Sequence, residues 1–492
     1  MKITEIKLTN FRAFAGEHSI KLDKPVACFV GENNTGKTTI FAALDFLRNG
    51  LPTGKKAEDF KNKAFPNDPV SVEITIQGNL NDVIKNFSED RYLPYVKSEN
   101  GIETIRLRRS SDEKEITQNG KKVSLNVGKI TILNESANQY ENPTGIDKAI
   151  GSLLEFQFVW SDMQASDVVD FGTTKTLGKL FKSVSDDFRS SSEWIDFKNA
   201  HKKAFISGEN ALSKKSDRII QNIQASLEQF YGKAKVALDF QPPDPSAFIK
   251  LGDIIINDGI ETSLSDKGSG MQRAFALSVI KVYADILTRH ENLAEIVKPI
   301  FFFIDEPEIS LHPKAQSVLV EALSEISKYH QIFITTHSPH FLKCCGAECS
   351  CIHICARDGN KLIVNPSSKL DTFTFSPTLA EINYLAFDLP TSDFHNELYG
   401  YIQEVTGAFT SPKLDAWMES ECAIPKDQKW IKVSRGVQQA PEDVSLSTYI
   451  RHSIHHPENT HNQAFSETEL KNSISSMLSV MSSQAFQSLK PR

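Results

Sequence analysis

Apolar and polar residues alternate at the start of the chain. Residues 3–8, ITEIKL, have the spacing expected of a strand with one buried face. A second strand is predicted to end in VACFV at residues 26–30, and a glycine-rich turn follows it. In TTIFAALDFL, residues 38–47, apolar residues recur at helical spacing. The start of the chain therefore predicts a strand, a glycine turn and a helix in direct succession.

Strand-like segments dominate residues 70–134. VSVEITI, ETIRLRR and KITILN are rich in β-branched residues, which favour strands. Between them, QNGKK contains Asn119-Gly120, a strong short-range hairpin signal. We expect this region to form an antiparallel β layer.

From about residue 176 the spacing becomes helical. LGKLFKSVSDDF and SDRIIQNIQASLEQFYGKA, within residues 176–235, predict an inserted helical hairpin of modest length. Beyond it the pattern predicts a hairpin turning at Asp258-Gly259, then a helix, a core strand, a helix and another core strand up to residue 336. After about residue 376 the pattern is helical and less regular. We expect residues 482–492, SSQAFQSLKPR, to be disordered.

Composition indicates an ordinary globular protein. The 492 residues are 40% hydrophobic and 24% charged, with 55 Lys and Arg against 62 Asp and Glu. This mildly acidic balance argues against nonspecific coating of nucleic acid by the whole surface. The N-terminus lacks the apolar core of a secretory signal, and no stretch approaches the ~18 apolar residues of a membrane span. We therefore expect a cytoplasmic protein with no membrane partner.

Cysteines crowd into one segment, CCGAECSCIHIC. They are Cys344, Cys345, Cys349, Cys351 and Cys355. A metal site is one interpretation, but the segment holds no CxxC pair. The alternative is a buried strand, SCIHICA, in which cysteine packs as a small hydrophobe. We favour the strand, and the odd total of seven cysteines suits no paired disulfide framework.

The stretch GENNTGKT, residues 31–38, fits the phosphate-loop pattern G-x-x-x-x-G-K-[ST]. Its glycines let backbone N–H groups close around phosphate oxygens, and the following helix N-terminus adds partial positive charge. Lys37 is expected to reach the β- and γ-phosphates of ATP, and the Thr38 hydroxyl to contact Mg²⁺. The predicted nucleotide-binding residues are Gly31, Glu32, Asn33, Asn34, Thr35, Gly36, Lys37, Thr38 and Thr39.

Two adjacent acids follow the apolar run FFFI at residues 301–304. Charge beside a buried strand is costly unless a cation or a reaction needs it. Asp305 is expected to hold the metal beside the phosphate loop, and Glu306 to polarise water for attack on the γ-phosphate. A helix N-cap would explain one acid, but not the apolar strand that leads into both.

Two further stretches complete the candidate chemistry. SDKGSGMQRAF, residues 265–275, is a second glycine-rich stretch opening onto a helix, and so a potential anion site. Taken alone, it is equally well explained as a plain helix cap. In ITTHSPHFL, His337 follows an apolar strand. A lone histidine there is usually structural, but its position after the acids favours contact with the γ-phosphate or the attacking water.

Together these stretches resemble ABC-type ATPases of the SMC-like and OLD-like group. LTNFRAF, the phosphate loop, KGSGMQR, FFFIDEPEISLHP and TTHSPHFL occur in the family's order within residues 1–360. The resemblance implies an α/β fold: an ABC-type ATPase head with an antiparallel β layer and a P-loop core sheet, a short inserted helical hairpin and a mostly helical C-terminal region. It also implies that two heads enclose two ATP molecules with Mg²⁺.

The family's roles carry over onto matching positions. Arg12 matches an arginine near the nucleotide, and Ser269 and Gly270 would face the phosphate loop of the other subunit. SLHP, residues 310–313, matches a segment that couples the two sites. The family also has a metal-contacting glutamine, for which Gln157 and Gln164 are both candidates.

The resemblance also suggests a division of the chain and a biological setting. The predicted domains are an N-terminal ATPase lobe (1–175), a helical insertion (176–240), a C-terminal ATPase lobe (241–365) and a helical C-terminal region (366–492). The last resembles stand-alone ATPases of bacterial phage defence, most nearly the ATPase subunit of PARIS-type systems, then Septu- and retron-associated ATPases. Such a subunit forms an oligomer, holds a separately encoded nuclease and responds to a phage protein. No D-x-D pattern follows His337, so we do not expect the Toprim domain of OLD nucleases.

Three functions stay open at this point. The first is a regulatory ATPase that controls a partner effector. The second is an ATPase with its own ribonuclease, since Arg451 and His456 have the R-x4-H spacing of HEPN nucleases. The third is a DNA-repair ATPase, for which only local clusters could bind DNA: Arg106, Arg108 and Arg109, or Lys202 and Lys203. We favour the first, and expect the C-terminal region to support assembly or partner contact rather than cleavage.

Overall fold

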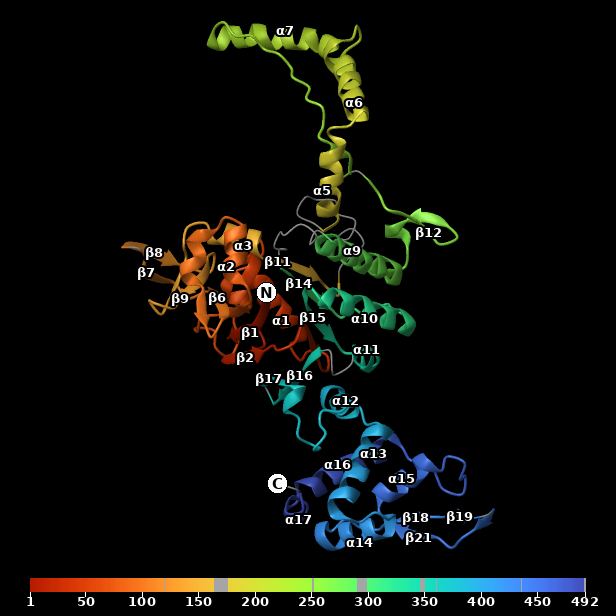
Figure 1. Ribbon diagram of the computed structural model, residues 1–492. Helices are drawn as coiled ribbons and strands as arrows, with labels where there is room; N and C mark the ends of the chain where they lie inside the picture. Colours follow the sequence, from red (N-terminus) through yellow and green to blue (C-terminus); the bar gives the residue numbers. More distant parts are fainter. Residues whose placement is uncertain are drawn as a thin grey trace. The chain divides into compact units, whose positions relative to one another are not determined.

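The computed structural model describes residues 1–118, 120–162, 176–249, 252–289, 299–345, 350–359, 361–434 and 436–490 (Figure 1). The chain forms two compact units. Unit 1 comprises Met1–Ser161, Lys298–Glu308 and His312–Arg492, and unit 2 comprises Asp162–Val297 and Ile309–Leu311. The phosphate loop, the paired acids and His337 therefore belong to unit 1, and the second glycine-rich stretch belongs to unit 2. The four-domain division remains a prediction.

One layer of unit 1 is an antiparallel sheet in the order β10-β9-β6-β4-β1-β2, with β5 paired to β6. Its strands are β1 (Lys2–Thr9), β2 (Glu17–Lys21), β4 (Ser71–Gln77), β5 (Lys97–Glu99), β6 (Ile102–Ser110), β9 (Ile130–Asn134) and β10 (Gln139–Glu141). A register shift between Ile3 and Glu5 accounts for the spacing of β1, in which Ile3 and Ile6 are both fully buried. The predicted antiparallel β layer is confirmed.

The hairpin predicted at QNGKK is also present. It joins β7 (Lys114–Gln118) to β8 (Lys121–Leu125), with Gln118 paired to Lys121. Gly120 has a positive φ of 73°, as a tight hairpin turn requires. Asn119 lies outside the described residues.

The second layer is a six-stranded sheet in the order β11-β14-β15-β3-β16-β17, parallel except between β16 and β17. Its strands are β3 (Val26–Val30), β11 (Glu155–Val159), β14 (Ile300–Asp305), β15 (Gln331–Thr336), β16 (Ser350–Asp358) and β17 (Lys361–Pro366). Residues 301–304 are at most 1% exposed, so the run before the two acids is a core strand, as expected. The parallel order places the carboxyl ends of β3, β14 and β15 at one edge of the sheet.

The cysteine-rich segment is described in two parts: Cys344 and Cys345 end the helix Pro339–Cys345, and residues 350–355 lie in a strand. Cys351 and Cys355 are buried in β16, which confirms the strand interpretation of SCIHICA. Cys349 lies outside the described residues. Across the part of the chain that the structure describes, no group of three or more His, Cys, Asp or Glu side chains could hold a metal ion.

Helices and short turns complete the ATPase part of unit 1. They are α1 (Lys37–Asn49), α2 (Leu80–Asn86), α3 (Ile146–Leu153), α10 (Pro313–Ser327), α11 (Pro339–Cys345) and the turns Ala57–Phe60 and Asp90–Tyr95. Glycines with positive φ bound α1 at both ends, Gly36 at 86° and Gly50 at 78°. His312 caps α10 through its side chain, and Pro313 occupies the first helical position, where its missing N–H costs nothing.

The C-terminal region of unit 1 has a helical core, as predicted. Its elements are the turn Ser367–Lys369, α12 (Leu379–Phe387), α13 (Ser392–Thr406), α14 (Ser411–Cys422), β18 (Gln428–Trp430), β19 (Val433–Ser434), β20 (Val437–Gln438), β21 (Glu442–Val444), α15 (Leu446–His455), α16 (Glu467–Ser482) and α17 (Gln484–Gln487). The β18–β21 and β19–β20 pairs were not predicted. The expected disorder of residues 482–492 is wrong for the described part, because Phe486 is fully buried against the helical core.

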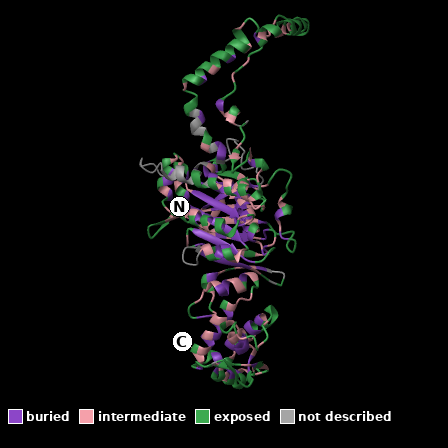
Figure 2. Cartoon of the chain, turned by 90° about the vertical axis from the view of Figure 1, so that its right-hand side faces the viewer, coloured by how far each residue is buried: buried purple, intermediate pink, exposed green. Residues whose placement is uncertain are grey.

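Unit 2 contains the insertion and the second glycine-rich stretch. Its elements are α5 (Thr176–Phe188), α6 (Ser192–Lys202), a turn at Lys203–Ser207, α7 (Leu212–Tyr231), α8 (Pro245–Ile249), β12 (Ile255–Asn257), β13 (Glu261–Ser263), a turn at Leu264–Asp266 and α9 (Ser269–Arg289). The insertion is helical as predicted, but it is no two-helix hairpin, because the chain returns from α7 in an extended segment (Figure 1). Figure 2 shows buried residues along the core strands and mostly exposed residues along the insertion. No described helix combines the length and apolar character needed to cross a bilayer.

Candidate nucleotide-binding site

The phosphate loop lies between β3 and α1 and is closely backed by β16 and β17. A Cβ atom at Gly31 would lie 2.1 Å from the Cys355 carbonyl oxygen, and one at Gly36 would lie 2.7 Å from Leu362 Cδ1. Both glycines also have positive φ, 152° and 86°. Side chains are therefore excluded at these two positions by space and by backbone conformation. The glycines predicted from the sequence are the ones the geometry requires.

Lys37 is drawn into the loop that precedes it. Its Nζ donates to the carbonyl oxygens of Gly31 at 2.9 Å and Glu32 at 2.8 Å, and the residue is 4% exposed. Burial lowers the pKa of the Lys37 ammonium, and the nearby charges of Glu306 and Asp305 oppose that effect. The loop thus holds a cation. Phosphate oxygens could replace the two carbonyl oxygens as acceptors of its hydrogen bonds. The neighbouring residues 32–34 are exposed.

Asp305 ends β14 and gathers hydroxyl groups from three segments. Its Oδ1 accepts from Thr38 Oγ1 at 3.0 Å and Thr335 Oγ1 at 2.6 Å, and its Oδ2 accepts from Ser161 Oγ at 2.9 Å. The carboxylate is 1% exposed. Carboxylate and hydroxyl oxygens suit Mg²⁺, which completes its coordination with water and substrate phosphates. The residues present therefore fit a magnesium ion held by Thr38 and Asp305.

Glu306 has a left-handed backbone, with φ of 46°. Such a conformation is uncommon for a residue with a side chain and is often found at functional sites. Its N–H donates to Thr335 Oγ1 at 3.0 Å, and its Oε1 lies 3.3 Å from His337 Nδ1. The carboxylates of the two adjacent acids thus contact different partners: that of Asp305 contacts hydroxyls beside the loop, and that of Glu306 contacts the histidine.

Three side chains at this edge were missed in the sequence analysis. Ser161 follows β11, Thr335 is the penultimate residue of β15, and Glu308 is the second glutamate of DEPE. Glu308 Oε1 accepts from Thr336 Oγ1 at 2.6 Å and from the His337 N–H at 3.0 Å. The signal for Glu308 was its position just past a core strand, the same reasoning that selected Asp305 and Glu306.

Arg12 is positioned by contacts with the turn Ala57–Phe60. Its N–H donates to the Phe60 carbonyl at 2.7 Å, and its guanidinium lies 4.8 Å from the centre of the Phe60 ring. Burial lowers the pKa of Arg12, and the charge of Asp45 on α1 opposes this. Stacking on Phe60 holds the guanidinium near α1, the helix that follows the phosphate loop.

The two candidate glutamines have different outcomes. Gln157, in β11, donates to Glu155 two residues away. Gln164 lies outside the described residues. Ser161, between them in the sequence, donates its hydroxyl to Asp305.

The second glycine-rich stretch is described within unit 2 alone. Ser269 begins α9, and its Oγ donates to Ser310 Oγ at 3.0 Å. A Cβ atom at Gly270 would lie 2.5 Å from the Ser310 carbonyl oxygen. The stretch therefore contacts the start of SLHP, the segment expected to couple two sites. Gln272 donates to the Lys267 carbonyl at 2.7 Å, which closes the turn before the helix.

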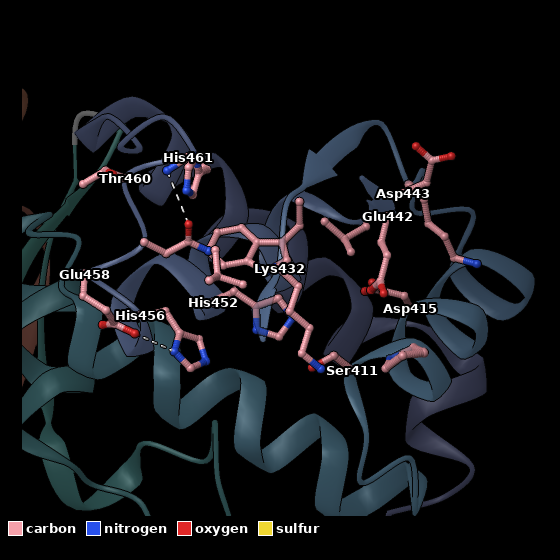
Figure 3. Close-up of a pocket in the computed structure, with 16 residues that line it drawn as sticks. Ser411, Asp415, Lys432, Glu442, Asp443, His452, His456, Glu458, Thr460 and His461 are labelled. Atoms are coloured by element: carbon pink, nitrogen blue, oxygen red, sulfur yellow. Dashed lines mark hydrogen bonds and ion pairs between the residues drawn. The ribbon is translucent and has the colours of Figure 1, made fainter. Parts of the chain in front are cut away.

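A polar pocket of about 580 Å³ lies in the C-terminal region, between α14, α15 and the β18–β21 pair (Figure 3). His456 lines it and contacts Glu458, with Nδ1 3.2 Å from Oε1. Arg451 is not among the lining residues. Its Nη1 donates to Asn396 Oδ1 at 2.7 Å, and its guanidinium lies over the Tyr399 ring. The structure does not bring the R-x4-H pair together in this pocket.

The arginines of β6 are engaged within the fold. Arg106 lies 3.8 Å from Glu135, and Arg108 stacks 3.8 Å from the centre of the Tyr140 ring. Arg109 is buried and donates to two backbone carbonyls. Lys202 and Lys203, in contrast, are exposed where α6 ends. The β6 cluster is therefore poorly suited to binding a nucleic-acid backbone.

Comparison with known families agrees with this geometry. The sequence profile of the AAA ATPase domain matches residues 1–342, a span that includes the phosphate loop, the acids and His337. The chain belongs to the AAA ATPase domain family. It is accordingly a nucleotide-binding ATPase.

Several curated relatives of this ATPase are named as nucleases. The chain is 27% identical over 444 residues to the Old nuclease of Escherichia phage P2, covering 84% of this chain and 71% of the relative. It is 25% identical over 369 residues to endonuclease GajA of Bacillus cereus strain VD045 (70% and 56%), and 22% identical over 327 residues to the OLD nuclease of Thermus scotoductus (64% and 56%). The chain thus spans little more than half the length of the last two.

Among solved structures, the chain is similar to an SMC head bound to the C-terminal winged-helix domain of ScpA. The TM-score is 0.43 at 15% identity, covering 74% of this chain and 98% of that one. An SMC head domain from Thermotoga maritima gives a TM-score of 0.34 at 14% identity, covering 74% and 99%.

Proposed function

We propose that this ATPase is the regulatory subunit of an anti-phage defence system and that it controls a separately encoded effector, a nuclease. The observation that carries the proposal is the contact network of Asp305, Glu306 and His337 at the edge of the core sheet. It supports regulated ATP hydrolysis as the chemistry of the chain. Relatives linked to nuclease function, and the resemblance of residues 366–492 to defence ATPases, support the biological setting.

The chemistry follows from the contacts described above. The loop N–H groups and Lys37 would bind the phosphates, with Arg12 nearby. Mg²⁺, held by Thr38 and Asp305, would offset phosphate charge. Glu306 would accept the proton of the attacking water, and His337 would orient that water or contact the γ-phosphate.

The assembly is part of the same proposal. Each phosphate loop would be completed by Ser269 and Gly270 of another copy of the chain, which requires at least a dimer. The likeness to the PARIS ATPase subunit, with Septu- and retron-associated ATPases next, suggests a higher oligomer and a phage protein as the trigger.

The experiment that tests this function is purification of the tagged chain from its native host before and after phage infection. We expect a nuclease to co-purify before infection and to be released after it. A Glu306→Gln chain should keep the nuclease bound after infection. The proposal fails if no protein co-purifies and the isolated chain itself cuts RNA or DNA when ATP and Mg²⁺ are present.

A further inference from the structure

Glu308 is a buried carboxylate that neither binds the phosphate loop nor contacts the glutamate assigned as general base. It is 7% exposed. Its Oε1 accepts the Thr336 hydroxyl at 2.6 Å and the His337 N–H at 3.0 Å. Its Oε2 is buried, and no described group donates a hydrogen bond to it. Burying an oxygen without a donor is destabilising, so a residue with fewer polar atoms would serve a purely structural role better.

The contacts at the strand ends form an ordered series. The Thr335 hydroxyl donates to Asp305 Oδ1. The hydroxyl and carbonyl oxygens of Thr335 both accept from the Glu306 N–H. The next residues along, Thr336 and His337, both donate to Glu308. Because β14 and β15 are adjacent and parallel, Asp305 and Glu308 each accept from residues at the end of β15 or just after it, whereas the Glu306 N–H donates to Thr335. Glu308 is the last acid of this series, and it accepts from the backbone N–H of His337.

The histidine is held at two points. Glu308 accepts from its backbone N–H, while its ring Nδ1 lies 3.3 Å from Glu306 Oε1 and 4.0 Å from Glu308 Oε1. The side chain of His337 is 40% exposed, so packing alone leaves the ring room to move. The bond to the backbone fixes the point from which the ring extends toward Glu306.

We propose that Glu308 is a positioning residue for ATP hydrolysis. It holds His337 in contact with Glu306, and it affects the reaction through His337 alone. The inference rests on the roles proposed above for Glu306 and His337. It assigns a task to the second glutamate of DEPE that is distinct from metal binding and proton transfer. A displacement of His337 by about 1 Å would be enough to slow the reaction on the order of 100-fold.

Two substitutions of Glu308 separate its hydrogen bonds from its charge. Glu308→Ala removes both acceptor contacts, and we expect kcat to fall on the order of 10- to 100-fold, with KM and ATP affinity within about threefold of wild type. Glu308→Gln keeps an oxygen where Oε1 lies, and we expect kcat to stay within about threefold. A Gln variant as slow as the Ala variant would contradict a positioning role, because the hydrogen bonds would not be what matters.

The deciding measurement is a double-mutant cycle on the full chain with His337→Ala. If Glu308 acts through His337, Glu308→Ala should slow the His337→Ala enzyme by less than about twofold. Losses that multiply would overturn the proposal while leaving the role of His337 intact. If His337→Ala hydrolyses ATP at the wild-type rate, the proposed role of the histidine fails, and that of Glu308 fails with it.

Glu141 provides the matched control. It is a glutamate of similar burial, 6% exposed, that accepts from Tyr95 Oη at 2.8 Å and Asn134 Nδ2 at 3.0 Å, in the edge strand β10. Glu141→Ala should lower Tm as Glu308→Ala does, but leave kcat and KM unchanged. Equal losses of kcat in both variants would make the effect one of general stability and overturn the proposal.

Thr336→Val provides a second route if Glu308→Ala does not fold. It removes one donor to Glu308 with little change of volume, at a fully buried position. We expect a several-fold loss of kcat that disappears in the His337→Ala background. A loss that persists undiminished in that background would again overturn the proposal.

Discussion

At the scale of single residues, Lys37 links the internal hydrogen bonds of the phosphate loop to the expected binding of phosphate. Its ammonium satisfies two carbonyls of its own loop and is surrounded by the negative charges of Glu306, Asp305 and Glu308. Among the described residues at this edge of the sheet, three carboxylates thus act on one lysine. This imbalance suits a site that binds phosphates together with a metal, and it explains why acids can end a buried strand.

The prediction at this scale concerns Lys37→Ala. The substitution removes the ammonium that should contact the β- and γ-phosphates, so ATP binding should weaken at least on the order of 100-fold, to the point of loss. Equilibrium binding of a fluorescent ATP analogue measures this directly. Binding within about threefold of wild type, in a chain with an unchanged Tm, would contradict the role of the loop.

At the scale of elements, the C-terminal helices carry a buried titratable contact. His395 on α13 is fully buried, and its Nε2 lies 3.0 Å from Ser473 Oγ on α16. Burial, helped by the nearby charge of Arg451, lowers the pKa of His395 to about 3 from an ordinary 6.5. Below pH 6.5 the unfolded chain therefore takes up a proton that the folded chain does not.

The expected consequence is a loss of stability in acid. The stabilisation by His395 is complete above pH 6.5 and should decline by roughly 1 kcal/mol per pH unit as the pH falls from 6.5 toward 3. His395→Gln removes the titration, so its Tm should change less than that of wild type between pH 7.5 and 5. Equal changes in Tm for the two chains would show that His395 is not the titrating group.

Sequence pattern predicted these elements unevenly, for physical reasons. The core strands and α1 were predictable because runs such as FFFID and the glycines of the phosphate loop have few alternative structures. The ordered packing of Phe486 could not be predicted, because the burial of one aromatic residue by helices distant in sequence leaves no local pattern. Ser161 was missed for a related reason, since a serine after a strand acquires meaning only when Asp305 is brought beside it.

At the scale of the whole molecule, two observations bear on nuclease function: the names of the relatives and the placement of the R-x4-H residues. Several of its curated relatives are named as nucleases, and the chain spans 71% of the length of one and 56% of two others. Its own R-x4-H residues point to different neighbours, Arg451 to Asn396 and His456 to Glu458. The R-x4-H residues are therefore not assembled into one site in the C-terminal pocket.

Sharing of sites between copies can be tested by mixing two inactive chains. Lys37→Ala should inactivate the phosphate loop, and Ser269→Arg should block the second glycine-rich stretch. A mixture can form one intact composite site, so it should recover part of the activity, up to about a quarter of wild type for random dimers in which half of the pairs are mixed. No recovery at any ratio, with both chains folded and assembling, would count against sites completed in trans.

The central claim is that Glu306 removes the proton from the water that attacks ATP. Its most direct test is a comparison of ATP binding and Mg²⁺-dependent turnover in the Glu306→Gln chain. An amide can occupy the same space but cannot accept the proton, so we expect ATP affinity within about threefold of wild type and turnover reduced on the order of 100-fold or more. Hydrolysis by Glu306→Gln at the wild-type rate would contradict the account.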